Sequence, residues 1–172
     1  GHDLKENILN FNTKEDAKIF LYKVKNPHQY GVANFKNKNL VMIKEKPKNS
    51  ISNYAVTGLY FYNSGVVKYA KKLKPSKRGE LEITDLNNVY IKENKMSYWE
   101  LSEMSIWFDA GTTSDLLSAS QYIKAIQERN NILISCPEEI AYKKKFISKK
   151  NFDNLTNNNI NNGYYNYLRN RI

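Results

Sequence analysis

Short apolar and aromatic runs separated by turn residues predict strands in the first part of the chain. Residues 18–24 (KIFLYKV) are rich in β-forming residues and apolar enough for a buried strand. Residues 31–35 and 40–46 predict a hairpin that turns at residues 36–39. Residues 53–62 (NYAVTGLYFY) form the strongest predicted strand. Their nearly continuous apolar character is typical of a central strand that is covered on both faces.

Elsewhere the apolar positions recur at helical spacing. Residues 3–11 predict a short helix, and residues 64–73 and 80–92 predict two more. Residues 96–101 and 106–108 are expected to be short strands. The second of the longer helices is expected to bury four apolar side chains: Leu81, Leu86, Val89 and Tyr90.

The last third of the chain is predicted to be helical. Residues 113–129 carry an apolar stripe, and either Thr113 or Ser114 can cap the helix. Residues 138–147 predict another helix, with Pro137 in its first turn. The Asn-rich and aromatic tail is expected to form one or two small helices, and partial disorder is the alternative. The stripe of the long helix is Leu116, Leu117, Ala119, Ile123 and Ile126.

This mixed order predicts an α/β protein with a mixed sheet and flanking helices. We find no internal repeat and no linker, so residues 1–172 are interpreted as a single domain. Within it, residues 1–112 supply the sheet and the site region, and residues 113–172 supply C-terminal helices.

Composition narrows the class of protein. The chain has 172 residues, of which 41% are hydrophobic and 26% charged, enough for one sizeable core. No apolar run approaches the length of a membrane span, and the first residues lack the order of a signal peptide. We therefore expect a cytoplasmic protein without membrane contact. The single cysteine, Cys136, cannot form an internal disulfide, and neighbouring carboxylates favour a packing role over a nucleophilic one.

The net charge of +10 is compatible with nucleic acid, an anionic membrane surface or small phosphorylated ligands. Lysine supplies most of the excess and is scattered among abundant Asn and Ile. The denser lysine clusters fall on predicted helices, and no nucleic-acid-binding motif accompanies them. Binding to nucleic acid is thus possible but unsupported.

Residues 74–85 (KPSKRGELEITD) form a basic turn that runs into a helix start. Pro75 fixes its own φ and Gly79 tolerates positive φ, so the turn can present the guanidinium of Arg78 to an anion. Taken alone, a solvated loop is the commoner outcome for such a turn. Polar residues at the ends of other predicted strands favour a binding site instead.

Further candidates lie at strand ends. Glu45 and Lys46 should point to opposite faces unless Pro47 breaks the pleat, and a solvated edge is the alternative. Gly31, after Tyr30, permits a close backbone approach to a ligand. Gly58, after Val56 and Thr57, offers a second close approach within the predicted central strand. Asp109 follows an apolar run and precedes a glycine turn. It is a candidate ligand for Mg²⁺, although a lone aspartate is more often a turn or cap residue.

Six motifs stand out in order and spacing: residues 30–32 (YGV), 45–47 (EKP), 52–62 (SNYAVTGLYFY), 74–85 (KPSKRGELEITD), 107–112 (WFDAGT) and 135–141 (SCPEEIA). Taken together, they resemble the glucose-1-phosphate thymidylyltransferases. The resemblance implies a Rossmann-like nucleotidyltransferase fold. It also implies a reaction in which glucose 1-phosphate attacks the α-phosphorus of dTTP, forming dTDP-glucose and pyrophosphate with Mg²⁺.

The resemblance implies a role for each candidate. Lys46 and Arg78 resemble the residues that neutralise the sugar phosphate, and Asp109 resembles one of the family's two Mg²⁺ aspartates. These residue types suit phosphoryl transfer, which depends on charge compensation and alignment. Three further positions resemble sugar contacts: Tyr30 with Gly31 as the sugar-binding turn, Glu45 as acceptor for hydroxyls, and Val56 through its backbone.

In that family, a glycine-rich phosphate loop, base-reading residues and the second Mg²⁺ aspartate precede the segment that matches the start of this chain. We therefore expect the N-terminal nucleotide-binding half to be absent here and the isolated chain to lack turnover. We also expect a separate N-terminal polypeptide, a homo-oligomer or marginal solubility, because an incomplete sheet exposes edges. The alternatives are a non-catalytic assembly or sugar-phosphate-binding remnant and, with less support, a basic nucleic-acid-binding module.

Overall fold

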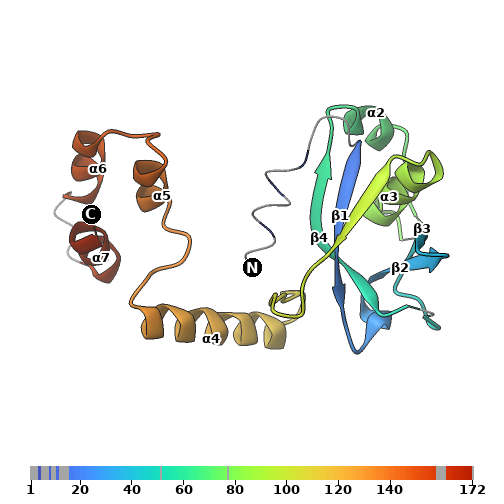
Figure 1. Ribbon diagram of the computed structural model, residues 1–172, viewed down its shortest axis with the longest axis horizontal. Coiled ribbons are helices and arrows are strands. Elements are labelled where there is room, and N and C mark those ends of the chain that lie inside the picture. The colour runs from blue at the N-terminus through green and yellow to red at the C-terminus, as the bar shows by residue number, and fades with distance from the viewer. Residues whose placement is uncertain are drawn as a thin grey trace. The chain divides into compact units, whose positions relative to one another are not determined.

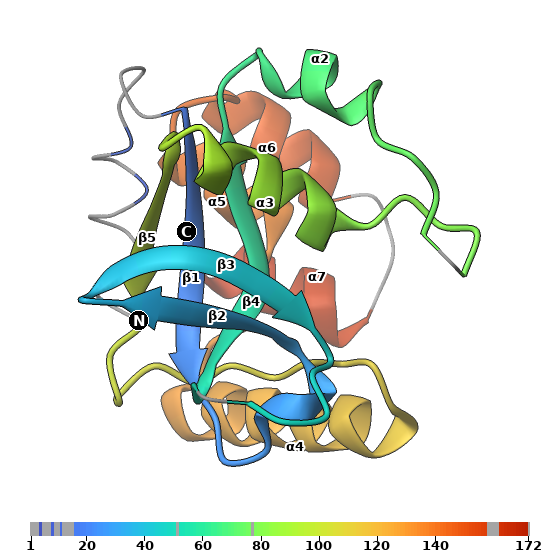
Figure 2. The same cartoon turned by 90° about the vertical axis from the view of Figure 1, so that its right-hand side faces the viewer.

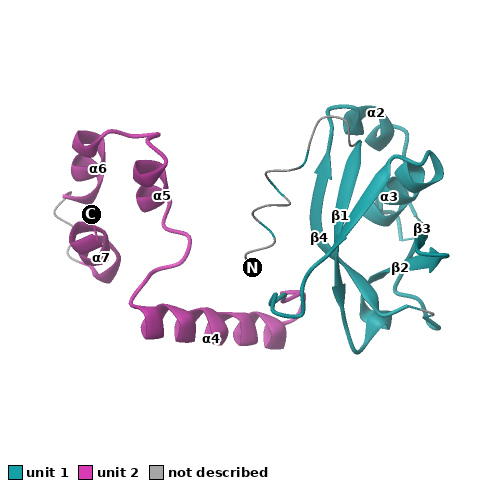
Figure 3. Ribbon diagram, viewed as in Figure 1, with its two compact units in different colours: residues 1–107 teal, residues 108–172 magenta. Residues whose placement is uncertain are grey.

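A computed structural model describes Leu4, Ile8, Phe11 and residues 16–50, 52–76, 78–157 and 162–171. The chain divides into two compact units, residues 1–107 and residues 108–172 (Figure 3). This boundary lies near residue 112, where the sequence separates the site region from the C-terminal helices. The interpretation as a single domain stays a prediction. Most of the helix predicted over residues 3–11 lies outside the described residues.

The first unit contains a mixed sheet (Figure 1). Among the described residues its strand order is β3-β2-β4-β1-β5. β5 runs parallel to β1, whereas the other paired strands are antiparallel. The predicted hairpin and the strands before and after it are confirmed, as is the strand near residue 96. The strands are β1 (Ala17–Lys23), β2 (Gly31–Lys36), β3 (Asn39–Glu45), β4 (Tyr54–Tyr62) and β5 (Met96–Glu100).

The prediction that β4 is central is confirmed, but its expected cover on both faces is not. Ala55 is buried, most of the other β4 residues are half-buried, and Gly58 is exposed. The register between β1 and β4 also shifts in the middle of the strand, where Gly58 has a φ of 75°. The Oγ1 of Thr57 donates to the carbonyl of Phe20 at 3.0 Å beside this irregularity. The nearly continuous apolar sequence of β4 therefore pairs with β1 through a hydrogen-bond ladder that is interrupted near Gly58.

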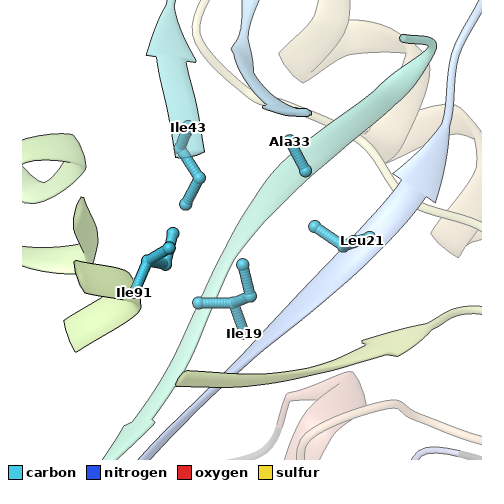
Figure 4. Close-up of a cluster of buried hydrophobic side chains, with 5 residues drawn as sticks. All are labelled: Ile19, Leu21, Ala33, Ile43 and Ile91. Atoms are coloured by element: carbon cyan, nitrogen blue, oxygen red, sulfur yellow. The ribbon is translucent and has the colours of Figure 1, made fainter. Parts of the chain in front are cut away.

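The β2–β3 hairpin and helix α3 (Ile83–Lys92) lie on the same side of β1 and β4 (Figures 1 and 2). A core cluster lies where these elements meet, with residues from β1, β2, β3 and α3 (Figure 4). Leu86 and Tyr90 of α3 are buried as predicted, whereas Leu81 is 59% exposed because the helix begins only at Ile83. The cluster consists of Ile19, Leu21, Ala33, Ile43 and Ile91.

Two predictions in the first unit need correction. The helix predicted over residues 64–73 is the shorter α2 (Val66–Ala70). Residues 106–108 do not form a strand. Instead, the indole Nε1 of Trp107 donates to the carbonyl of Thr57 at 3.2 Å, and its ring contacts those of Tyr22 and Tyr30. The aromatic composition indicated a strand here, but Trp107 packs its side chain against neighbouring rings without strand pairing.

The second unit is helical. The long helix α4 begins at Thr113 as predicted, but its cap is Thr112 and neither Thr113 nor Ser114, because the Oγ1 of Thr112 accepts from the backbone N–H of Asp115 at 3.1 Å. No residue described in α4 is buried. In its apolar stripe Leu116, Leu117 and Ile123 are exposed, and Ala119 and Ile126 are half-buried. The tail is helical, as one of the two readings expected. The helices are α4 (Thr113–Asn130), α5 (Pro137–Lys143), α6 (Lys149–Thr156) and α7 (Gly163–Arg171).

The second unit has a small core of its own, formed by Cys136, Phe152 and Leu168. Burial raises the pKa of the Cys136 thiol, and the nearby Glu139 carboxylate adds to this rise. The prediction of a packing cysteine is thus confirmed. Helix α5 begins at Pro137 as predicted, but ends before Lys145, which has a φ of 61°.

Candidate functional site

A polar cluster forms where the β2–β3 hairpin opens. Gly31 begins β2 and pairs with Glu45, which ends β3. A Cβ atom at Gly31 would lie 3.3 Å from the Oε2 of Glu45 and 3.6 Å from the Oγ1 of Thr84. The hydroxyl of Thr84 donates to this same Oε2 at 2.7 Å. Glycine therefore lets the Glu45 carboxylate lie close to the start of β2, where Thr84 holds it.

Lys46 lies directly after this carboxylate in an uncommon backbone conformation. Its φ is 40°, and its backbone N–H donates to the carbonyl of Tyr30 at 3.0 Å. The pleat is therefore broken at Lys46, the residue before Pro47, and β3 ends at Glu45. A positive φ is costly for a residue with a Cβ, and such strain is concentrated at functional sites.

The turn that carries Arg78 is closed by hydrogen bonds. The backbone N–H of Ser76 donates to the carbonyl of Glu80 at 2.8 Å, and that of Gly79 donates to the carbonyl of Ser76 at 2.9 Å. Gly79 has the positive φ, 79°, that the sequence indicated. Arg78 does meet an anion, but in this structure the anion is the carboxylate of Glu82, at 2.9 Å from Nη2.

The charges of this corner act on one another. The hydrogen bond from Arg78 is the largest cause that lowers the pKa of Glu82, a second from Ser76 adds to it, and the charge of Lys46 contributes. The bond to Glu82 is also the main cause that raises the pKa of Arg78, with a smaller effect from Glu45. The charges of Lys46 and Glu45 thus act, more weakly, on the pair formed by Arg78 and Glu82.

Tyr30 and Val56 occupy different surroundings. The ring of Tyr30 contacts that of Trp107, with ring centroids 5.1 Å apart. Val56 is opposite Leu21 in the β1–β4 pairing and packs against the core cluster of the first unit. Its backbone lies next to the register shift at Gly58. The roles expected for both residues in sugar binding stay predictions.

Asp109 belongs to the second unit. Its carboxylate bends back towards Gly111, where a Cβ atom would lie 3.5 Å from its Oδ2. Within the described ranges, no three His, Cys, Asp or Glu side chains gather as a metal site. A single exposed carboxylate still fits Mg²⁺ as one ligand, because this ion completes its shell with water and phosphate oxygens.

Sequence reasoning missed several residues of the polar cluster. Glu82 and Thr84 were seen only as part of an acid-rich helix start, although they bind Arg78 and Glu45. Tyr60 does lie in the central strand and packs against the core cluster, and the charge of Glu45 adds to the rise that burial causes in its pKa. No helical spacing could have found Glu82, because the residues from Arg78 to Glu82 precede α3.

Comparison with known proteins adds a family match. The model of the family described as "Nucleotidyl transferase" matches residues 1–126. A glucose-1-phosphate thymidylyltransferase of Neisseria meningitidis serogroup A is 42% identical over 153 residues, which are 88% of this chain and 53% of the relative. One from Xanthomonas campestris is 41% identical over 170 residues, which are 98% of this chain and 58% of the relative. The chain thus spans a little over half the length of these curated relatives.

Solved structures give the same fold. A crystal structure from Bacillus anthracis, described as a glucose-1-phosphate thymidylyltransferase in complex with sucrose, is 48% identical with a TM-score of 0.60. It aligns with 70% of this chain and 47% of its own. A UDP-glucose pyrophosphorylase in complex with UDP-glucose is 21% identical with a TM-score of 0.59, over 71% of this chain and 49% of that one. The predicted nucleotidyltransferase fold, a mixed sheet with flanking helices, is confirmed.

Proposed function

The chain belongs to the nucleotidyl transferase family, and from that premise we propose that it is the sugar-phosphate-binding part of a glucose-1-phosphate thymidylyltransferase. The similarity to relatives of that name supports the proposal. The observation that carries it is that Glu82, which binds Arg78, and Thr84, which binds Glu45 opposite Gly31, lie two residues apart at the start of α3.

In this proposal each side chain has one task. The cations of Lys46 and Arg78 neutralise the phosphate of glucose 1-phosphate, since its oxygens match charge-assisted N–H donors. Glu45 accepts hydrogen bonds from sugar hydroxyls while Thr84 fixes its Oε2. Tyr30, Gly31 and the backbone of Val56 form the wall against the sugar. An analogue that lacks the hydroxyl would lose this hydrogen bond and bind more weakly.

The proposed reaction needs no activated side chain. An oxygen of the sugar phosphate, already anionic, forms a bond to the α-phosphorus of dTTP, and the bond from that phosphorus to the oxygen bridging to the β-phosphate breaks. Pyrophosphate leaves with the electron pair, and dTDP-glucose remains. The residues of this chain contribute charge compensation and alignment of the attacking oxygen.

Magnesium is part of the same proposal. Asp109 would supply one carboxylate ligand, and water and phosphate oxygens would complete the shell. When bound, the ion would neutralise phosphate charge and orient the phosphates. We further propose a cytoplasmic location, which the free Cys136 thiol supports. Among the described residues, no helix is both long and apolar enough to span a bilayer.

Binding of glucose 1-phosphate to the 172-residue chain tests the proposal directly. In a titration followed by NMR, we expect shifts at Gly31, Glu45 and Arg78, and much weaker effects with glucose or with glucose 6-phosphate. Absence of binding, or shifts confined to the second unit, would contradict the proposed function. Because the phosphate is the main charged group of the ligand, binding should weaken with salt.

Turnover distinguishes the proposal from a non-catalytic remnant. Pyrophosphate release from dTTP and glucose 1-phosphate is measured with the chain alone and with a polypeptide that corresponds to the preceding half of the relatives. We expect no release from the chain alone and release from the mixture. Sugar-phosphate binding without release in either case would favour the remnant. Size measurement of the same samples tests the proposed partner or homo-oligomer.

A further inference from the structure

We propose that Glu82 is a positioning residue that holds the Arg78 guanidinium by one edge, so that its other edge faces the phosphate of the ligand. This inference rests on the proposed sugar-phosphate site. It concerns a residue outside the expected set of site residues, and it predicts that a negative charge next to a phosphate-binding cation strengthens binding of an anion.

The contact between Glu82 and Arg78 is closely matched in geometry. The Oε1 of Glu82 accepts from Nε of Arg78 at 3.2 Å and from Nη2 at 2.9 Å, and Oε2 accepts from Nη2 at 3.1 Å. Pairing of a planar guanidinium edge with a carboxylate fixes orientation as well as distance. The contact thus restrains a side chain that otherwise has many rotamers.

The two partners differ in how firmly they are held. The side chain of Glu82 is 17% exposed, whereas that of Arg78 is 56% exposed. The hydroxyl of Ser76 also donates to the Oε1 of Glu82 at 2.8 Å, and the backbone N–H of Arg78 donates to that hydroxyl at 3.2 Å. The shielded carboxylate therefore serves as the anchor, and the exposed guanidinium is the group that it places.

The bonds use one edge of the guanidinium. In the part of the chain that the structure describes, the hydrogen bonds of the Arg78 side chain run from Nε and Nη2. Glu80 adds only a longer contact, 3.6 Å from Nη2, with a carboxylate that is 69% exposed. Arginine has further donors on Nη1 and Nη2, and their fork matches phosphate oxygens.

Glu82 also links the phosphate side of the site to the sugar side. It is the residue directly before α3, with extended backbone (φ −91°, ψ 128°), and its side chain does not cap the helix. Two residues later, Thr84 holds the carboxylate of Glu45. One rigid helix start thus fixes both the cation for the phosphate and the acceptor for the hydroxyls.

Two roles of Glu82 lead to opposite outcomes. If Glu82 merely competes with the phosphate for Arg78, the substitution Glu82→Gln frees the guanidinium and tightens binding. If Glu82 positions Arg78, the same substitution loosens the guanidinium and weakens binding. Glu80→Gln is the matched control, because it removes the same charge from the same guanidinium without removing the anchoring bonds.

The experiment measures the full chain and its variants by NMR, first without ligand and then in a titration with glucose 1-phosphate. In the free wild type we expect a slowly exchanging Nε–H signal from Arg78, which Glu82→Gln loses and Glu80→Gln keeps. Glu82→Gln should bind glucose 1-phosphate about tenfold more weakly, as expected for one charge-assisted contact. Glu80→Gln should stay within about twofold of wild type.

Several results would overturn the inference. An unchanged Nε–H signal in Glu82→Gln would exclude the anchor even if no variant binds the ligand. Equal or tighter binding by Glu82→Gln would show competition in place of positioning. If the wild type keeps the signal but does not bind glucose 1-phosphate, the proposed function fails while the anchor stands. Should Glu82→Gln fail to fold, Ser76→Ala serves instead, with the same signs and an effect of about threefold.

Discussion

The two units of this protein organise polar side chains in different ways. In the sheet unit, the contact between Thr84 and Glu45 joins residues 39 positions apart. In the helical unit, contacts one helical turn apart, such as Lys149 with Asp153, accompany longer ones between helices, such as Tyr167 with Glu139, 28 positions apart. Strand register and the start of α3 place the cluster of the first unit, whereas helix periodicity and helix packing place the contacts of the second.

The cores differ in the same way. Strands and a helix from much of the first unit enclose the cluster around Ile19, Leu21 and Ile43. The second unit buries a smaller set, Cys136, Phe152 and Leu168, and buries no described residue of α4. The sheet unit therefore has the rigid support that a binding site needs. The following predictions test how separate the two units are.

The largest effect is expected in the small core. Phe152 is 1% exposed, so Phe152→Ala should destabilise the helical unit by about 3–5 kcal/mol through lost burial and the cavity left behind. Hydrogen exchange should reveal faster opening of α5 to α7 with unchanged protection of β1 and β4. The matched control is Phe146→Ala, because Phe146 is 79% exposed and its loss should change stability little. Equal loss of protection in β1 would mean that the units unfold together.

The next effect concerns the candidate site. Arg78→Ala should weaken glucose 1-phosphate binding by about 10–100-fold, because one or two charge-assisted hydrogen bonds to the phosphate are lost. Arg171→Ala removes a partner of Glu139 in the other unit and should leave the affinity within about twofold. Isothermal titration measures both variants. Similar losses in the two variants would place the binding site elsewhere.

A smaller effect separates strain from charge. Lys46→Gly relieves the positive φ of 40°. The free energy of unfolding should rise by about 0.5 kcal/mol, because relief of strain exceeds the added freedom of the unfolded chain. Loss of the ammonium should at the same time weaken glucose 1-phosphate binding several-fold. Lys145→Gly, at a φ of 61° in the second unit, should give the same gain without loss of affinity. Chemical denaturation measures the stability of both variants, and titration measures their affinity for glucose 1-phosphate. An equal loss of affinity in both variants would contradict the prediction.

The smallest effect is on acid stability, and both units should show it. The Arg78 hydrogen bond is the main cause that lowers the pKa of Glu82 below 4.5. Burial opposes the shift in Glu139, but Lys143 and Tyr167 hold its pKa below 4.5 too. A folded-state pKa below the unfolded value means that each contribution to stability is complete above about pH 4.5 and is lost as the pH falls through the folded value.

This acid loss can be assigned to each unit. Glu82→Gln should flatten the acid loss of protection in α3, and Glu139→Gln should flatten it in α5, as measured by hydrogen exchange between pH 3 and pH 6. Because Glu82 lies at an exposed arginine, its effect should be the weaker of the two. If neither substitution changes the loss of protection at acid pH, other carboxylates cause that loss.

Much of the fold could be predicted from the sequence. Runs such as residues 18–24 and 53–62 have a composition that only strands accommodate well, and α4 has an unmistakable helical period. The strand predicted over residues 106–108 was wrong, because the ring of Trp107 packs against other aromatic rings and its indole N–H donates a hydrogen bond, which composition does not reveal. The prediction that Leu81 is buried was wrong, because the helix begins later, at Ile83.

The contacts of the candidate site were not predictable from the sequence. The motifs pointed to Glu45, Lys46 and Arg78 as site residues, which stays a prediction, and the structure shows that Thr84 binds Glu45 and that Glu82 binds Arg78. The partners Glu82 and Thr84 were missed, because a carboxylate and a hydroxyl at a helix start are usually caps. A sequence does not show which of several neighbouring acids faces a cation.

The sequence by itself determined most of the strands and most of the helices, because side-chain periodicity and turn chemistry act locally. Only the tertiary structure decided that Thr84 holds Glu45, that Glu82 holds Arg78 and that the pleat breaks at Lys46. Those contacts depend on strand register and on where α3 begins beside β3. Hydrogen bonds form only within about 3.2 Å, so placement at that precision requires the packed core.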